Sequence, residues 1–172
     1  MGKIVRSSSN EGTLLLLHID DSADDRFLVK YAIRETGTAF TLHQVESIAA
    51  AVPYFEFHRH DGEPKQFPRP ALVLLDYDLG PQTGADFLVW LRNVKKMTSI
   101  PVVMLSGSVG EPFVEECYAN GANCFLSKPN DLAGMKTLIC SLYLSLSVPE
   151  GPSEPLHLLP EYQPRAAVRP RA

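Results

Sequence analysis

The sequence predicts an α/β fold in which a five-stranded parallel sheet lies between two layers of helices. Short, continuous apolar runs alternate along the chain with segments whose apolar residues recur at helical spacing. Such runs suit strands that are buried on both faces, and parallel strands joined by right-handed helical crossovers satisfy the repeat. Polar residues follow the ends of several runs, so we expect the functional groups at one edge of the sheet.

Length and composition limit the class of protein. The chain has 172 residues, of which 45% are hydrophobic and 21% are charged, as in one globular domain with a proper core. A formal net charge of -4 without a local basic patch gives no reason to expect a nucleic-acid partner. No apolar run reaches the roughly 18 residues of a membrane span, and the N-terminus lacks the apolar core of a secretory signal. We therefore expect a cytoplasmic protein.

The first strand and helix follow a polar segment. Residues 1–12 are polar and rich in serine, and we expect them to be disordered. The run TLLLLHI predicts a strand over 13–19. Ser22, followed three residues later by Asp25, resembles a capping box, and Gly37 is suited to end the helix that begins there.

The second strand and helix precede a long loop. The run FTLHQV predicts a strand over 40–45. Ser47 can cap a helix over about 48–58, in which Pro53 either produces a kink or marks the true start of the helix. Residues 59–70 have the composition of a loop.

The remaining elements complete the repeat. We expect strands over 71–75, 100–105 and 124–126, and helices over about 84–96, 111–119 and 131–146. Prolines are concentrated in 149–172, which excludes a helix there and predicts a disordered tail. For five strands and five helices at this size, the flavodoxin-like strand order 2-1-3-4-5 is the common solution.

Five polar residues follow the strand ends. Asp20 and Asp21 end the first strand, Asp76 the third and Ser106 the fourth, and Lys128 follows the fifth. Strands one and three are neighbours where the expected order reverses, which is where ligands bind. Three carboxylates repel one another unless a cation neutralises them, and Mg²⁺ prefers such oxygen ligands. In this pocket Asp76 can attack phosphorus to form an aspartyl phosphate, while Lys128 and Ser106 contact the phosphoryl oxygens.

Four motifs, in order and at the right spacing, resemble a known family. LLHIDDS, LVLLDYD, VVMLSGS and GANCFLSKP are similar to the motifs of the CheY-like response-regulator receiver domain, and the resemblance covers residues 13–146. The long loop before the third strand and the phrase IPVVMLS resemble stand-alone receivers that serve bacteriophytochrome-type histidine kinases. The resemblance implies a receiver domain over 13–148 that acts as a single-domain response regulator in a two-component phosphorelay.

The resemblance also implies the roles of individual residues. Asp76 would be the phosphoacceptor. Asp21 would bind Mg²⁺ directly, Asp20 would act mainly through a metal-bound water, and Asp78 would offer its backbone carbonyl. The Lys128–Pro129 peptide bond would be cis.

A conformational switch is implied by the same resemblance. Ser106 would be the switch hydroxyl, drawn toward the phosphoryl group, and Phe125 would be the aromatic residue that turns inward behind it. This movement would change the face formed by the helix at 111–119, the strand at 124–126 and the helix at 131–146.

The last predicted helix is more apolar than one sheet requires. Its apolar residues cover well over half of the circumference, whereas packing on a sheet needs only a stripe. They are Leu132, Met135, Leu138, Ile139, Cys140, Leu142, Tyr143, Leu144 and Leu146. We therefore expect a homodimer or a docked partner at this face, and the alternative is that the tail covers it.

Other functions compete with phosphoacceptance. Asp76-Tyr77-Asp78 matches the DxD motif of haloacid-dehalogenase-like phosphatases, which also use Mg²⁺. In those enzymes the DxD motif ends the first strand, whereas here an acidic pair comes first, and Gly80 stands where a threonine is expected. A module that binds partners without phosphorylation is a second alternative, opposed by the presence of all five pocket residues. In a third alternative, the tail over 149–172 is the output segment and the receiver controls its release.

The histidines have simpler interpretations. His18, inside the first predicted strand, is expected to be a hydrogen-bonded core residue rather than a phosphodonor. His58 and His60 lie in a polar loop without a further ligand in sight, which favours solvated side chains over a metal site.

Overall fold

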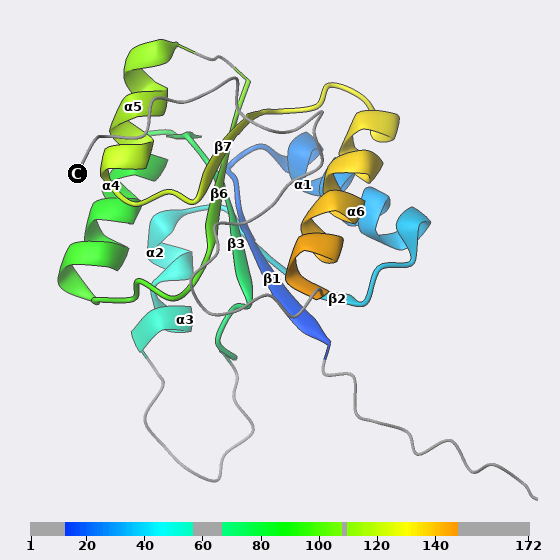
Figure 1. Cartoon of the computed structure of the whole chain (residues 1–172), viewed down its shortest axis with the longest axis horizontal. Helices are drawn as coiled ribbons and strands as arrows, with labels where there is room; N and C mark the ends of the chain where they lie inside the picture. Colours follow the sequence, from blue (N-terminus) through cyan, green and yellow to red (C-terminus); the bar gives the residue numbers. More distant parts are fainter. Residues whose placement is uncertain (1–12, 57–66, 108–109, 148–172) are drawn as a thin grey trace, which may run out of the picture.

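A parallel sheet of five strands forms the centre of the molecule (Figure 1). The computed structural model describes residues 13–56, 67–107 and 110–147, so the predictions for 1–12 and 149–172, and most of the 59–70 loop, lie outside the described residues. The strand order is β2-β1-β3-β6-β7, which confirms the predicted 2-1-3-4-5 order. The strands are β1 (Leu14–Ile19), β2 (Phe40–Val45), β3 (Leu72–Asp76), β6 (Val102–Ser106) and β7 (Cys124–Ser127).

Helices cover both faces of the sheet and complete three layers. On one face, α1 and α6 lie side by side, and the other helices lie on the opposite face (Figure 1). The first pair is α1 (Ala23–Thr36) and α6 (Leu132–Ser147). The second group is α2 (Ile48–Ala51), α3 (Pro53–Glu56), α4 (Gly84–Val89) and α5 (Glu111–Ala119).

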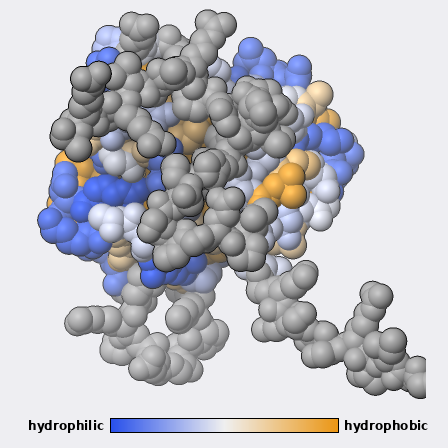
Figure 2. Space-filling model, in the orientation of Figure 1, coloured by the Kyte–Doolittle hydropathy of each residue, from blue (hydrophilic) through white to orange (hydrophobic). Residues whose placement is uncertain are grey.

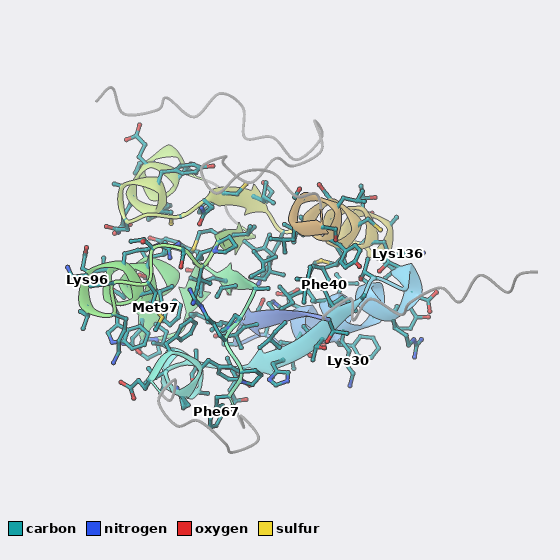
Figure 3. All side chains as sticks on the ribbon, turned by 60° about the horizontal axis from the view of Figure 1, so that its bottom comes forward. Lys30, Phe40, Phe67, Lys96, Met97 and Lys136 are labelled. Carbon is teal, nitrogen blue, oxygen red and sulfur yellow. The ribbon has the colours of Figure 1, made fainter. Side chains whose placement is uncertain are left out.

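The core is divided by the sheet into two apolar clusters. Leu15 and Leu17 of β1 belong to the cluster under α2–α5, while Leu16 belongs to the one under α1 and α6. Successive side chains of a strand point to opposite faces, so a strand with a helix layer on each side must be apolar throughout. In Figure 3, Phe40 lies between the sheet and α6, where its ring meets Tyr143 at a centroid distance of 5.3 Å.

The first helix has the predicted ends. Ser22 Oγ accepts a hydrogen bond from the amide of Asp25 at 3.3 Å. Gly37 adopts a left-handed conformation with φ 63° and donates its amide to the carbonyl of Ile33. Glycine enters this conformation without the steric penalty of a side chain.

Two predicted helices are less regular than expected. The helix predicted over about 48–58 is two short helices, because a new one starts at Pro53, which has no amide hydrogen to continue the preceding turn. The helix predicted over 84–96 continues after α4 as a π-helix, Trp90–Val94. A small antiparallel hairpin of β4 (Asp78–Leu79) and β5 (Gln82–Thr83), which the sequence analysis did not predict, follows β3.

Helix α1 covers part of the apolar surplus of α6. Met135, Leu138, Ile139 and Leu142 are buried, and α6 packs against α1 as well as against apolar side chains of the sheet. Leu144 stays 53% exposed. Where Figure 2 shows the surface uncovered by grey atoms, apolar residues form small separate groups among hydrophilic ones. The homodimer therefore stays a prediction.

The helices do not have the character of membrane spans. In the described ranges, none is both long enough and apolar enough to cross a bilayer.

Gly84 lies close to the backbone that follows β3, and its amide donates to the carbonyl of Tyr77 at 2.8 Å. A Cβ atom added here would overlap the carbonyl oxygen of Asp76 and lie 2.7 Å from Cε of Met104. We predict that Gly84→Ala lowers the free energy of unfolding by about 1–3 kcal/mol, the usual effect of overpacking. Urea denaturation measures this change.

The matched control for Gly84→Ala is Gly107→Ala. An added Cβ at Gly107 meets no atom within 4 Å, so its effect should stay below about 1 kcal/mol. Equal effects of the two substitutions would contradict the steric explanation.

Candidate functional site

Three carboxylates meet at the carboxyl edge of the sheet. Asp20 and Asp21 follow β1, and Asp76 ends β3, the strand paired with β1. One oxygen from each residue lies within 4.8 Å of one from each of the others. Asp20 and Asp76 are buried, whereas Asp21 is exposed. The structure thus brings together the three acidic residues that the strand ends predicted.

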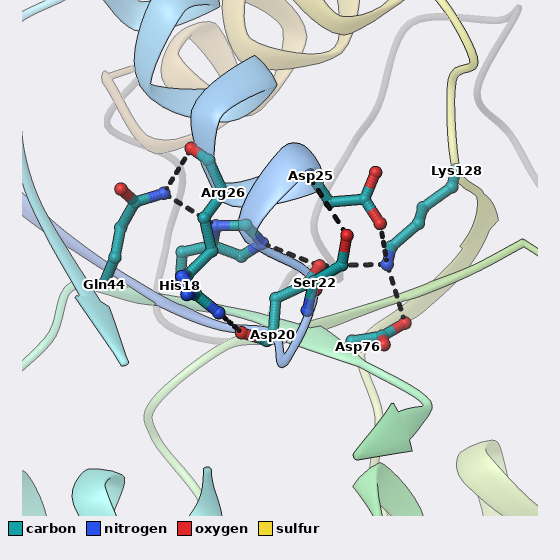
Figure 4. Close-up of polar contacts among 8 residues, drawn as sticks. All are labelled: His18, Asp20, Ser22, Asp25, Arg26, Gln44, Asp76 and Lys128. Carbon is teal, nitrogen blue, oxygen red and sulfur yellow. Dashed lines mark hydrogen bonds and ion pairs between the residues drawn. The ribbon is translucent and has the colours of Figure 1, made fainter. Parts of the chain in front are cut away.

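Lys128 neutralises part of this charge. Its Nζ atom lies 2.9 Å from Oδ2 of Asp20, 3.1 Å from Oδ1 of Asp76 and 2.8 Å from Oδ2 of Asp25 (Figure 4). Burial alone would lower the pKa of Lys128, but its contacts with the carboxylates of Asp25 and Asp20 outweigh burial and raise it. The lysine therefore stays a cation inside the pocket.

Asp25 is a site residue that the sequence analysis did not assign. Its position in the sequence predicts only a part of a helix cap, and its amide does donate to Ser22. Its carboxylate, however, contacts Lys128, which is 103 positions away in the sequence. Asp25 lies in the first turn of α1, directly after the segment that carries Asp20 and Asp21, and this closeness in the sequence is the signal that could have placed it at the same edge.

The two buried carboxylates differ in acidity. Burial raises the pKa of Asp76, the charge of Lys128 lowers it, and the charge of Asp20 raises it, with a net value of about 6. Burial alone would raise the pKa of Asp20, but contacts with His18 and Lys128 hold it below its usual value. Asp20 is therefore the more firmly ionised of the pair.

The predicted switch residues lie on β6, which pairs with β3, and on β7, the next strand of the sheet. Ser106 ends β6 and is buried, and its carbonyl accepts the amide of Lys128 at 2.8 Å. Phe125 of β7 pairs in register with Met104, and its side chain is only 4% exposed. The backbone amide of Phe125 donates to Oη of Tyr118 at 3.1 Å. Both residues thus lie close in the fold to the segment that carries Lys128.

Comparison with known proteins identifies the family. A model described as the response regulator receiver domain matches residues 16–139. The chain belongs to this family. It is 31% identical over 133 residues to the two-component response regulator ARR15 of Arabidopsis thaliana. The matched region covers 77% of this chain and 64% of ARR15. The chain is 30% identical over 131 residues to the response regulator Rcp1 of Synechocystis sp., covering 76% of this chain and 86% of Rcp1.

Solved structures agree with the assignment. The phosphorylated cyanobacterial phytochrome response regulator RcpA superposes with a TM-score of 0.66 at 25% identity, covering 80% of this chain and 98% of that one. The Mn²⁺-bound form of Rcp1 gives a TM-score of 0.61 at 28% identity, covering 73% of this chain and 88% of that one. The CheY-like α/β fold of this receiver is therefore shown.

The receiver has a donor set that fits a divalent cation. The clustered side chains offer only carboxylate oxygens, the ligands that Mg²⁺ and Mn²⁺ prefer. Oδ2 of buried Asp20 has no well-aligned hydrogen bond, although the Lys128 ammonium lies at ion-pair distance. The side chain of Asp78 is exposed in β4, and its negative charge contributes to the raised pKa of Asp76.

One prediction about this receiver is wrong. The Lys128–Pro129 peptide bond is trans, since the described residues include no cis peptide bond. The trans form of an X–Pro bond is favoured by about 0.5–1 kcal/mol. With this bond trans, Lys128 already reaches three carboxylates.

The raised pKa of Asp76 predicts a pH-dependent stability in metal-free receiver. The folded state disfavours the ionised form of Asp76, so ionisation imposes a penalty on the free energy of unfolding. The free energy of unfolding is therefore highest, as far as this group is concerned, below pH 4, and it falls as the pH rises through about 6. Asp76→Asn removes this penalty. We predict that the variant is more stable than wild type by about 2 kcal/mol at pH 7.5, and that the difference shrinks toward pH 4.5.

Urea unfolding in the presence of a chelator, at several pH values, measures this difference. Asp24→Asn changes an exposed carboxylate that is not among the groups that shift the pKa of Asp76, and it serves as the control, with little effect on stability at any pH. A stabilisation by Asp76→Asn that does not vary with pH would contradict the assigned burial of the Asp76 charge.

Proposed function

We propose that this receiver is a single-domain response regulator that accepts a phosphoryl group on Asp76 from a sensor histidine kinase. The observation that carries the proposal is the position of Asp76: it is buried beside Asp20 and Asp21, and Lys128 Nζ lies 3.1 Å from its Oδ1. Phosphoacceptance needs a fixed carboxylate nucleophile with positive charge beside it, and this geometry supplies both.

The residues of the pocket have distinct roles in the proposed transfer. A carboxylate oxygen of Asp76 forms a bond to phosphorus while the bond from phosphorus to the kinase imidazole breaks, and that imidazole keeps the electron pair and takes up a proton. Lys128 and the Ser106 hydroxyl contact the phosphoryl oxygens as charge moves onto them. With a pKa of about 6, Asp76 is mostly ionised, and so nucleophilic, at neutral pH.

The proposed cation is Mg²⁺. Asp20, Asp21, Asp76 and the backbone carbonyl of Asp78 would hold it, and when bound it neutralises phosphoryl charge. The Mn²⁺-bound form of Rcp1 supports a divalent cation in a relative. The chain itself supports it through the clustered carboxylates.

The proposed output is a change at the face of α5, β7 and α6. Movement of Ser106 toward the phosphoryl group would displace its neighbours on β6 and β7, Phe125 among them. Phe125 is already buried, so its part in the switch is a change of packing within the core. The same face is the proposed site of homodimer formation.

The proposed kinase is of the phytochrome type, and the proposed location is cytoplasmic. The similarity to Rcp1, and to the phosphorylated cyanobacterial phytochrome response regulator RcpA, supports the kinase assignment. The proposal treats this receiver as a phosphoacceptor rather than an enzyme, with at most slow release of its own phosphoryl group.

Phosphoacceptance is tested by the mass of the intact protein after incubation with acetyl phosphate and Mg²⁺. We predict a base-labile phosphoryl adduct on wild type and on Asp78→Asn, and none on Asp76→Asn, because only Asp76 is placed to attack phosphorus. If wild type forms no adduct with acetyl phosphate or with a phosphorylated kinase, the receiver is a binding module that acts without phosphorylation.

Cation binding is tested separately by thermal unfolding. We predict that Mg²⁺ at about 100 times its dissociation constant stabilises wild type by about 2.7 kcal/mol, which raises the midpoint by roughly 5–10 °C. Asp21→Asn should lose most of this gain without loss of basal stability, because the side chain is exposed. The exposed carboxylate of Asp24 provides the control, and an equal gain in Asp21→Asn and Asp24→Asn would exclude Asp21 as a ligand.

A further inference from the structure

His18 is a buried polar residue that the proposed transfer does not use. It lies in β1 two residues before Asp20, so the two side chains share one face of the sheet. Both are almost completely buried, with 1% and 0% exposure. Nε2 of His18 lies 3.3 Å from Oδ2 of Asp20, and Nδ1 lies 3.1 Å from Nε2 of Gln44 (Figure 4).

The neighbours of His18 determine which ring nitrogen carries the hydrogen. Nε2 of Gln44 lies 2.7 Å from the backbone carbonyl of Arg26, which can only accept, so this atom must be the amide nitrogen. An amide nitrogen donates and does not accept, so Nδ1 of His18 must present a lone pair to it. The hydrogen is then on Nε2, which lies 3.3 Å from Oδ2 of Asp20. Neither of these two buried atoms has a well-aligned hydrogen bond to another group, so each is left with the other as a polar neighbour, and Oδ2 also with the ammonium of Lys128.

The fold places these groups together. His18 and Gln44 are direct partners in the parallel register of β1 and β2. Nη1 of Arg26, in the first part of α1, donates to the backbone carbonyl of Asp20 at 2.6 Å. Contacts therefore run from the Asp20 side chain to His18, then to Gln44 and Arg26, whose guanidinium returns to the backbone carbonyl of Asp20.

We propose that His18, held in its Nε2–H form by Gln44, is a positioning residue that orients the Asp20 carboxylate for a divalent cation. The inference rests on the proposed function, in which Asp20 contributes to the cation site. It also gives Asp20 a second partner: Lys128 is shared with Asp25 and Asp76, so when Lys128 turns to a phosphoryl group, His18 stays on Asp20.

The form of the ring is tested directly on the full chain without metal. Long-range ¹H–¹⁵N spectra of the imidazole groups, with His18→Gln used to assign the signals, show which nitrogen of His18 carries the hydrogen. The inference expects hydrogen on Nε2 and a bare Nδ1. Hydrogen on Nδ1 would overturn it, because His18 could not then donate to Asp20.

The effect on the cation site is tested by calorimetric titration of the full chain with Mg²⁺. His18→Leu keeps the buried volume but removes the donor, and we expect Mg²⁺ affinity to fall at least about tenfold, as for other residues that orient metal ligands. His18→Gln restores an N–H donor, and its affinity should stay within about threefold of wild type. Urea unfolding of both variants checks that they are folded.

The outcomes separate this inference from the proposed function. If wild type binds Mg²⁺ and is phosphorylated but His18→Leu binds Mg²⁺ equally well, only the role of His18 is overturned. The same holds if both substitutions weaken binding equally, since a purely structural role would not distinguish a donor from an apolar side chain. If wild type binds no Mg²⁺ and forms no adduct, the proposed function fails and the inference with it.

Discussion

The charge of one ammonium group holds the carboxyl edge of the sheet together. Lys128 lies within 3.1 Å of oxygens from Asp20, Asp25 and Asp76, which belong to the ends of β1 and β3 and to the first turn of α1. Removing charges from water costs several kcal/mol for each ion, and only opposite charges at short range offset this cost. Without Lys128, the buried carboxylates of Asp20 and Asp76 would face each other uncompensated. The geometry of the edge therefore depends on the segment after β7 as much as on the strands that carry the acids.

Lys128 does not stabilise the ionised forms of these acids equally, and the resulting difference in pKa suits the proposed phosphoryl transfer. Asp20 has additional contact with His18 and is held ionised, whereas burial raises the pKa of Asp76 to about 6. Perturbed ionisation of this kind is common where residues are arranged for reaction rather than for stability. In the proposed function, the excess negative charge would attract a divalent cation, and the cation would in turn offset the charge of a phosphoryl group. The same residues thus weaken the metal-free fold and prepare the pocket.

The rest of the receiver provides a stiff frame around this edge. The strands beneath it are buried on both faces by two apolar clusters, and close-packed interiors transmit displacement rather than absorb it. The carbonyl of Ser106 accepts the amide of Lys128, and Phe125 precedes that lysine by three positions on the neighbouring strand. A change in the position of Lys128 would therefore displace β6 and β7 first, on the side of the sheet next to α5.

The sequence by itself determined the strand order and most of the pocket. Buried parallel strands must be continuously apolar, so the polar residues at their ends, Asp20, Asp76 and Lys128, stand out and topology alone brings them to one edge. Tertiary structure decided the contacts between distant residues. Asp25 reaches Lys128 across 103 positions, and Gln44 reaches His18 across 26, and no local pattern specifies such pairs. Periodicity reports which face of an element is buried, whereas the partner of a buried polar group depends on how the elements pack.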